Sequence, residues 1–222
     1  ARMVKDLRDL SGAGMMDAKK ALLACDGAMD EAVDWLRTKG LAKAAKKADR
    51  VASDGLIGVH ASNEGAVAVE INSETDFVAK NDEFQEMVRD ISIVAMNADS
   101  VESLLSKSIG EKAIKDIITD KIRVIGENLT VRRMVKLEGK NVAHYIHNSV
   151  GEGLGKLVVL VSYEGENGDL ARQVAMHIAA SNPQALNKDE LDPSIIEREK
   201  SVLTEQARES GKPEQVIEKM ID

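Results

Sequence analysis

The feature that most constrains the fold is a change in the spacing of apolar residues near residue 55. Before this point apolar residues recur at the spacing of helices, and after it they alternate as they do in strands. Two such runs, residues 56–62 and 66–72, flank Asn63-Glu64-Gly65, which has the composition of a hairpin turn. The sequence therefore predicts a small helical module followed by a core that contains a β-sheet.

Residues 3–38 predict a compact three-helix module of the ubiquitin-associated type. The first helix ends where the segment Ser11–Gly14 interrupts the helical pattern, and Gly40 is expected to end the third helix. Beyond this glycine, residues 41–52 are rich in alanine and lysine and predict a helical linker.

The core predicts two related units. Residues 56–97 run strand, strand, helix, and residues 142–180 repeat this order. A helix at 111–128 and a strand at 130–137 follow the first unit, and the strand closes it, whereas no third strand follows the second unit. The expected fold class is therefore α+β.

Two polar helices with thin apolar stripes are predicted at residues 191–207 and 213–221. A glycine–lysine–proline turn joins them, so they are expected to form an antiparallel helical hairpin that projects from the core. These patterns divide the chain into five segments: the three-helix module 1–40, the helical linker 41–54, the first core subdomain 55–140, the incomplete second core subdomain 141–182, and the helical hairpin 183–222, within which the chain ends.

The charge of the chain disfavours some functions. Its formal net charge is −8, which argues against a nucleic-acid binder. Basic residues gather between Arg37 and Arg50, either as a solvated helix between domains or as a contact for an acidic partner, and no aromatic residue is interleaved there for stacking. The single cysteine, Cys25, indicates a reducing compartment. No run approaches the roughly 18 apolar residues of a membrane span.

No group of residues in the sequence favours an enzyme or a metal site. His144 and His147 are three residues apart on a predicted strand and would point to opposite faces, while His177 is expected to pack against its surroundings on a helix. The glycine loop at 151–155 joins two strands rather than a strand and a helix, which is the wrong context for a phosphate-binding loop. We therefore expect neither a catalytic residue nor a metal or cofactor.

One segment stands out, because Glu74–Lys80 carries one of only two phenylalanines in the chain. It follows a predicted strand and precedes a helix whose start would be capped near Asn81 or Asp82. Two interpretations remain open. Phe77 could be a core side chain that closes the loop, or an aromatic anchor presented to a partner on a rigid strand-to-helix turn.

Four separated segments carry a resemblance to a known family. Residues 11–22 (SGAGMMDAKKAL) closely resemble the N-terminal module of the bacterial translation elongation factor Ts family, and Thr75–Lys80 (TDFVAK) looks like the core signature of that family. Residues 125–128 (IGEN) and 176–180 (MHIAA) look like further family segments. Because all four occur in the right order, the resemblance covers essentially the whole chain.

The resemblance implies a guanine nucleotide exchange factor rather than an enzyme. Members of the family bind elongation factor Tu with its GDP, displace Mg²⁺ and speed the release of GDP so that GTP can replace it. The partner holds the nucleotide and the Mg²⁺, so no cofactor, direct nucleic-acid contact or membrane is implied for this chain. The implied location is the cytoplasm, with an organelle of bacterial origin left open. The alternative is a non-catalytic interaction adaptor of the ubiquitin-associated type.

The resemblance also implies roles for individual residues. The segment that displaces the magnesium ion from the partner is matched by Thr75, Asp76, Phe77 and Val78. The ring of Phe77 would enter between two helices of the partner's GTPase domain. The N-terminal positions that touch a partner helix are matched by Lys5, Arg8, Met15 and Met16. The core positions that reach the nucleotide side of the partner are matched by Ile125, Gly126 and His147.

The sequence departs from the family at its end. In longer members the chain returns from the helical hairpin and completes the second β unit, whereas this chain ends at Asp222 in the second hairpin helix. This agrees with the third strand that the second unit lacks, and we expect that unit to be incomplete.

Overall fold

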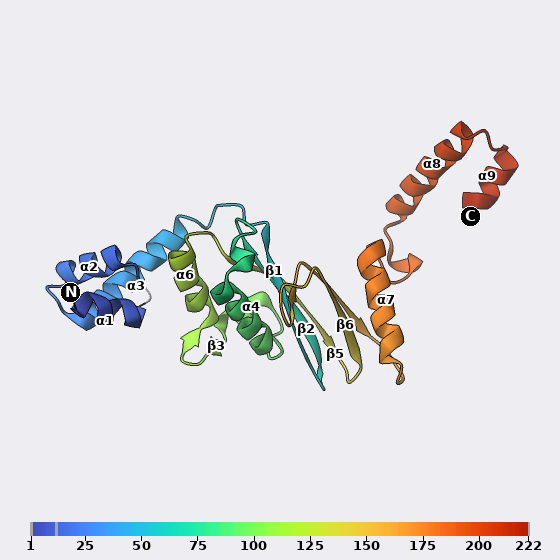
Figure 1. The fold of residues 1–222 in the computed structure, drawn as a ribbon. Helices are drawn as coiled ribbons and strands as arrows, with labels where there is room; N and C mark the ends of the chain where they lie inside the picture. Colours follow the sequence, from blue (N-terminus) through green and yellow to red (C-terminus); the bar gives the residue numbers. More distant parts are fainter. Residues whose placement is uncertain (1, 12, 222) are drawn as a thin grey trace. The chain divides into compact units, whose positions relative to one another are not determined.

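The computed structural model describes residues 2–11 and 13–221 (Figure 1). The chain forms two compact units, the first ending at Ala179 and the second beginning at Ala180. Gly12, which belongs to the predicted break after the first helix, lies outside the described residues.

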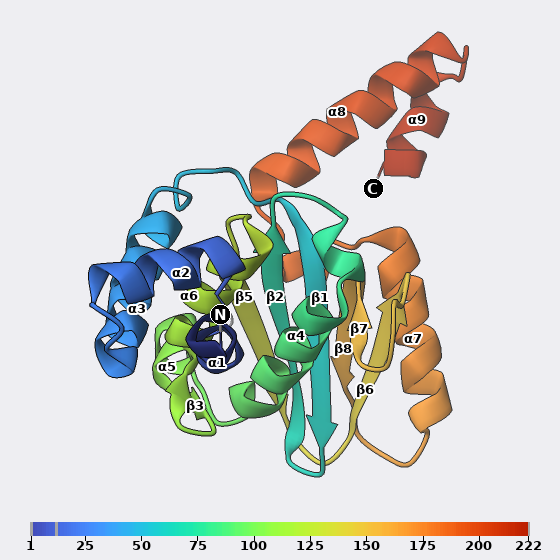
Figure 2. The same cartoon turned by 60° about the vertical axis from the view of Figure 1, so that its left-hand side comes forward.

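The N-terminal module consists of three helices, as the sequence predicts. Its small core is built from the buried side chains of Leu7, Ala18, Ala21, Ala32 and Leu36. The alanines allow the helix axes to approach closely, since a methyl group takes little space between two backbones. The three helices, grouped together in Figure 2, are α1 (Arg2–Ser11), α2 (Met15–Ala24) and α3 (Met29–Ala45).

The expected helix end at Gly40 is wrong, because α3 continues through this glycine to Ala45. The predicted helical linker is also wrong beyond Ala45, because residues 46–53 form turns and irregular structure and β1 begins at Asp54. A glycine inside a helix costs only about 1 kcal/mol relative to alanine, so it does not by itself end one. The reason for a glycine here lies on another helix. A Cβ atom at Gly40 would come within 3.1 Å of Cδ of Arg123. The missing side chain therefore makes room for Arg123.

The main sheet has the strand order β5-β2-β1-β7, and the neighbouring strands pair antiparallel. The predicted hairpin is confirmed, with Ser62 paired to Gly65 at its turn. The helix α4 packs on β1 and β2, where Phe84, Val88 and Ile91 are completely buried. These elements are β1 (Asp54–Ser62), β2 (Gly65–Ser73), β5 (Thr130–Glu138), β7 (Leu154–Gly155) and α4 (Asp82–Ala95).

A set of short elements between α4 and β5 was not expected from the sequence. It contains a one-and-a-half-turn helix and a minimal hairpin, both too short to show a hydrophobic period. The longer helix that follows begins at Ile114 rather than at 111, and it ends where Gly126 takes a left-handed conformation with φ 89°. These elements are α5 (Val101–Ser106), β3 (Ser108–Ile109), β4 (Lys112–Ala113) and α6 (Ile114–Ile125).

The second core unit repeats the order strand, strand, helix. Its two strands form a separate antiparallel sheet, and the glycine loop between them supplies β7 to the main sheet. Figure 1 shows the layers in the order α4, main sheet, second sheet and helix α7. The elements of this unit are β6 (Val142–His147), β8 (Leu157–Ser162) and α7 (Gly168–Ser181).

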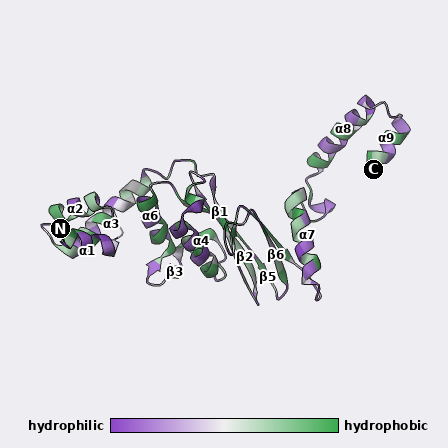
Figure 3. Cartoon of the chain, in the orientation of Figure 1, coloured by the Kyte–Doolittle hydropathy of each residue, from purple (hydrophilic) through white to green (hydrophobic). Residues whose placement is uncertain are grey.

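The predicted helical hairpin is formed by two helices that pack on each other through the buried side chains of Ala207 and Ile217. Arg208 ties the two helices together through an ion pair with Glu214 at 2.7 Å. Hydrophilic and hydrophobic residues alternate along both helices (Figure 3). The projection of this hairpin from the core stays a prediction. The elements of the compact unit that begins at Ala180 are η2 (Lys188–Glu190), α8 (Pro193–Glu209) and α9 (Glu214–Ile221).

We predict that Gly58→Ala weakens the core. A Cβ atom at Gly58 on β1 would lie 2.8 Å from Cγ1 of Val88 and closer still to Oγ of Ser92, so strand and helix would have to separate. Overpacking of this kind costs about 1–3 kcal/mol of unfolding free energy, measured by urea denaturation. Gly151→Ala is the matched control, because its nearest atom would be at an ordinary 3.6 Å. Equal stability of the two variants would contradict this prediction.

Candidate functional site

The candidate site is the loop that connects β2 to α4. The strand β2 ends at Ser73, and a short helix, η1 (Val78–Lys80), precedes α4. Asn81 caps α4, since its side-chain oxygen accepts a hydrogen bond from the amide of Phe84 at 3.0 Å. The cap expected near residue 81 is thus confirmed, and it fixes the direction in which the loop enters the helix.

The aromatic side chain of Phe77 lies on the surface of this loop. Phe77 is 75% exposed, whereas Val78 and Ala79, which follow it, are buried. The interpretation of Phe77 as a core side chain is therefore wrong, and the ring is free to contact another molecule. The other phenylalanine, Phe84, is completely buried in the core.

Two charged residues flank the exposed ring. Nζ of Lys80 lies 5.4 Å from the centroid of the Phe77 ring and 3.2 Å from Oδ2 of Asp76. Both charged side chains are exposed, so their mutual attraction adds little to stability. They do set the local arrangement, because Lys80 lies over one side of the ring and its ion pair keeps Asp76 beside it. Asp76, Phe77 and Lys80 thus form one small exposed patch.

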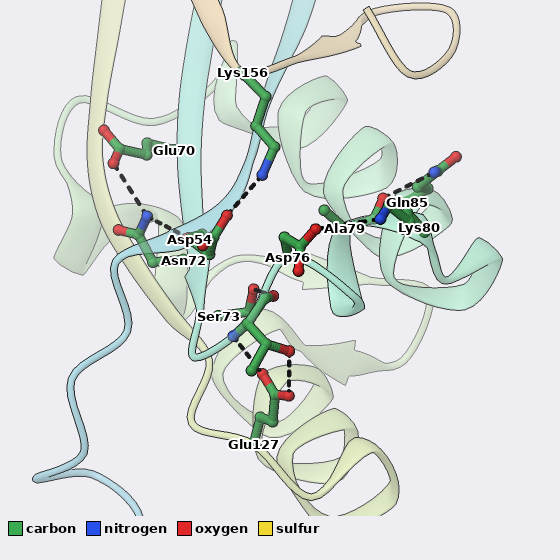
Figure 4. Close-up of polar contacts among 11 residues, drawn as sticks. Asp54, Glu70, Asn72, Ser73, Asp76, Ala79, Lys80, Gln85, Glu127 and Lys156 are labelled. Carbon is green, nitrogen blue, oxygen red and sulfur yellow. Dashed lines mark hydrogen bonds and ion pairs between the residues drawn. The ribbon is translucent and has the colours of Figure 1, made fainter. Parts of the chain in front are cut away.

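A carboxylate from a distant part of the chain holds the start of the loop (Figure 4). Oε2 of Glu127 accepts a hydrogen bond from the amide of Thr75 at 2.9 Å, and Oε1 accepts one from the Thr75 hydroxyl at 2.6 Å. The Ser73 hydroxyl donates to the carbonyl of Thr75 at 2.9 Å. Hydrogen bonds to an ionised acceptor are stronger than those between neutral groups. The backbone at Thr75 is therefore fixed on both sides.

A second carboxylate makes the reverse contact. Oε1 of Glu74 accepts a hydrogen bond from the amide of Asn128 at 2.6 Å. The side-chain amide of Asn128 in turn donates to the carbonyls of Ala48 at 3.3 Å and Arg50 at 2.9 Å. Asn128 is buried, so these bonds satisfy a polar side chain that would otherwise be costly to bury. Three chain segments meet at this point.

The strand that leads into the loop is anchored by Glu70. Burial alone would raise the pKa of this carboxyl group, but hydrogen bonds from Arg132, Arg133 and Asn72 outweigh it and lower the pKa. A lowered pKa means that these contacts stabilise the fold above the pKa of the unfolded chain and are lost as pH falls through the folded pKa. Asn72 also donates to the carbonyl of Asp54 at 2.7 Å, which joins β2 to the start of β1.

The structure brings the Thr75–Val78 group together with two of the three residues of a second predicted group, Ile125 and Gly126, but not with its third, His147. Ile125 and Gly126 lie at the end of α6, directly before Glu127, so they are neighbours of the Thr75 segment. Ile125 is partly buried against the core, and Val78 is almost completely buried, so these two side chains support the loop from below. Glu127 belongs to the family segment at residues 125–128, but no local pattern in the sequence predicts its contact with Thr75, 52 residues away.

The remaining predicted site residues lie on other elements. Lys5 and Arg8 are exposed on α1, and Met15 and Met16 are more than half exposed at the start of α2. His147 is exposed at the end of β6, where its Nδ1 lies 3.1 Å from the Tyr145 hydroxyl.

The histidines do not gather into a site. Within residues 2–11 and 13–221, no three side chains of His, Cys, Asp or Glu lie close enough together to hold a metal ion. The expectation that His177 is packed is wrong, because its side chain is exposed. The buried face of α7 is formed by Ala171 and Ala175, and position 177 does not lie on it. In the same part of the chain, none of the helices has both the length and the apolar character needed to cross a membrane.

Comparisons with known proteins show which sequences this chain resembles. A family model described as "Elongation factor TS" matches residues 74–222. A protein named elongation factor Ts from Jannaschia sp. (strain CCS1) is 58% identical over 221 residues, which is all of this chain and 76% of that protein. The proteins of the same name from Dinoroseobacter shibae and Ruegeria pomeroyi are 57% and 58% identical, with the same coverage.

These likenesses define a translation elongation factor, a protein that acts in protein biosynthesis. The match to this relative extends over the whole chain, and the range matched by the family model includes the loop that carries Phe77. The chain belongs to the elongation factor Ts family.

The two phenylalanines provide a matched test of the site. We predict that Phe77→Ala changes the free energy of unfolding by less than about 0.5 kcal/mol, because the ring is exposed. Phe84→Ala should cost about 3–5 kcal/mol, because it empties a completely buried position. Urea denaturation followed by circular dichroism measures both values. If Phe77→Ala lowered the free energy of unfolding by more than about 2 kcal/mol, as a core truncation does, its ring would be packed in solution.

Proposed function

We propose that this protein binds elongation factor Tu with GDP bound and promotes release of the GDP, so that GTP can replace it. The observation that supports this proposal is the exposed ring of Phe77, which a rigid loop presents in a chain with only two phenylalanines. Membership of the elongation factor Ts family supports the choice of partner. The protein would act without chemistry of its own, by binding alone.

The energetic requirement can be stated simply. GDP is held by contacts to its phosphates and by Mg²⁺, which bridges phosphate and protein oxygens. A factor that bound the closed and the opened partner equally well would shift nothing. An acceleration of ~10³-fold requires ~4 kcal/mol of binding energy that is available only in the opened state. A buried aromatic anchor supplies about 2–4 kcal/mol, so one ring and a few polar contacts suffice.

Each residue of the loop then has a distinct role. The ring of Phe77 enters between two helices of the partner and moves the groups that coordinate Mg²⁺. Asp76 adds a negative charge beside the ring, and Thr75 holds the backbone through Glu127. Val78 fills the core beneath the loop and keeps the ring at the surface.

Two further surfaces complete the proposed interface. On the nucleotide side of the partner we assign contacts to Ile125, Gly126 and His147. On a partner helix we assign contacts to Lys5, Arg8, Met15 and Met16. The methionines are exposed, and their flexible side chains can adapt to an apolar surface.

The alternative of a simple interaction adaptor is not favoured. An adaptor of the ubiquitin-associated type would use the three-helix module, and it would not require the rigid loop of the core. Family membership supports the exchange factor instead. We further assign its action to the cytoplasm, since its relatives are bacterial translation factors.

We predict that Phe77→Ala lowers the limiting rate of GDP release from elongation factor Tu by about tenfold to a hundredfold, which corresponds to ~1.4–2.7 kcal/mol. Stopped-flow release of fluorescent GDP at saturating factor measures this rate. The control is Leu186→Ala, which also removes a highly exposed apolar side chain but lies in the second unit. Unchanged release in Phe77→Ala would exclude the proposed role of the ring.

We predict that the double variant Met15→Ala, Met16→Ala weakens binding but preserves exchange. The concentration of factor for half-maximal release should rise about tenfold, since two exposed apolar contacts of about 0.5–1 kcal/mol each are removed. The limiting rate should stay within threefold of the unmodified protein. Leu23→Ala, on the same helix and 70% exposed, is the control. A large fall in the limiting rate would mean that the module takes part in opening the nucleotide site.

A further inference from the structure

The loop that presents Phe77 is held by an exchange of carboxylates between two connecting segments. Glu127, after α6, accepts hydrogen bonds from the amide and the hydroxyl of Thr75. Glu74, after β2, accepts a hydrogen bond from the amide of Asn128. Each segment therefore supplies an acceptor to the other, and the four residues form what we call the carboxylate clamp.

The clamp lies where regular structure cannot order the backbone. The residues between Ser73 and Val78 belong to neither the sheet nor the helix, so no ladder of hydrogen bonds restrains them. The amide of Thr75 donates a hydrogen bond to Glu127, and the hydroxyl of Ser73 donates one to the carbonyl of Thr75. Without these bonds the loop would have to be ordered when a partner binds, and that cost would reduce the energy available for opening the partner.

We propose that Glu127 is a positioning residue, which holds the Phe77 loop in its binding conformation before a partner arrives. This inference rests on the proposed exchange function and adds a residue to it that does not itself touch the nucleotide or Mg²⁺. Glu127 acts through Thr75, which is two residues before the ring. Glu74 acts in the opposite direction and holds the segment that follows Ile125 and Gly126.

The clamp also joins two contact surfaces into one body. The ring of Phe77 is on one segment, and Ile125 and Gly126 are on the other. The two oxygens of Glu127 accept hydrogen bonds from two different groups of Thr75. The pair of bonds therefore restrains both the distance between the two segments and their relative orientation. When Phe77 binds a partner, Ile125 and Gly126 are therefore already in position to contact it.

The first test measures the loop in the free protein. Hydrogen–deuterium exchange of the amides of residues 75–80, followed by NMR, should be about tenfold faster in Glu127→Ala than in the unmodified protein. The amides of buried Phe84 and Ile91 should keep their protection and serve as the internal reference. Glu127→Gln should keep most of the loop protection, because a side-chain amide can still accept from the Thr75 amide and donate to its hydroxyl.

The second test measures GDP release from elongation factor Tu. Glu127→Ala should lower the limiting rate roughly tenfold and change the half-saturating concentration less than threefold, and Glu127→Gln should restore most of the rate. A merely structural defect would give the opposite pattern. Partial unfolding lowers the concentration of active factor, so the same limiting rate is reached at a higher total concentration. Glu86→Gln, on the exposed face of α4, controls for the loss of one negative charge.

The Thr75 side of the clamp gives an independent variant in case Glu127→Ala does not fold. Thr75→Val removes one of the two hydrogen bonds and should accelerate loop exchange, whereas Thr75→Ser should not. Unchanged loop protection and an unchanged limiting rate in Glu127→Ala or Thr75→Val would overturn the proposal. If Phe77→Ala releases GDP normally, the proposed function fails, and the amide measurement still decides whether the clamp orders the loop.

Discussion

The packing of α4 on β1 and β2 is the interaction on which the first unit depends. Phe84, Val88 and Ile91 are completely buried there, and Gly58 allows the strand and the helix to approach closely. The candidate loop connects this strand pair to this helix, so the same packing fixes both of its ends. An aromatic side chain can be kept at the surface in a defined direction only if its backbone is restrained in this way.

The polar contacts act on a smaller scale than the apolar core. Burial of aliphatic side chains holds the sheet and the helix together, whereas the carboxylates of Glu74 and Glu127 set the conformation of single backbone positions. Such contacts act locally, and they decide which conformation of the loop backbone is populated. The loop at the edge of the core is therefore ordered by polar contacts, although the core itself contains almost no aromatic residues.

Much of the fold could be predicted because its signals are local. The hairpin around Asn63-Glu64-Gly65, the helix α4 with its cap at Asn81 and the amphipathic helices at the end of the chain all show in the spacing of neighbouring residues. The sequence predicts Phe77 as either buried or exposed and cannot decide between the two. Burial depends on which distant segments pack against the side chain, and local spacing does not show this. The pairing of Thr75 with Glu127 and the room that Gly40 leaves for Arg123 join distant segments, which no local pattern reports.

The helix α3 is continuous through Gly40 to Ala45, and residues 46–53 then lead to β1 as turns and irregular structure. Arg123 of α6 lies against α3 at Gly40, and its guanidinium group donates a hydrogen bond to the carbonyl of Ser11 at the end of α1. Each residue of an α-helix turns the chain by about 100° and advances it by about 1.5 Å. A single insertion in α3 between Leu36, which belongs to the core of the module, and Gly40 would therefore turn Met15 and Met16 by about 100° relative to the contact between Gly40 and Arg123.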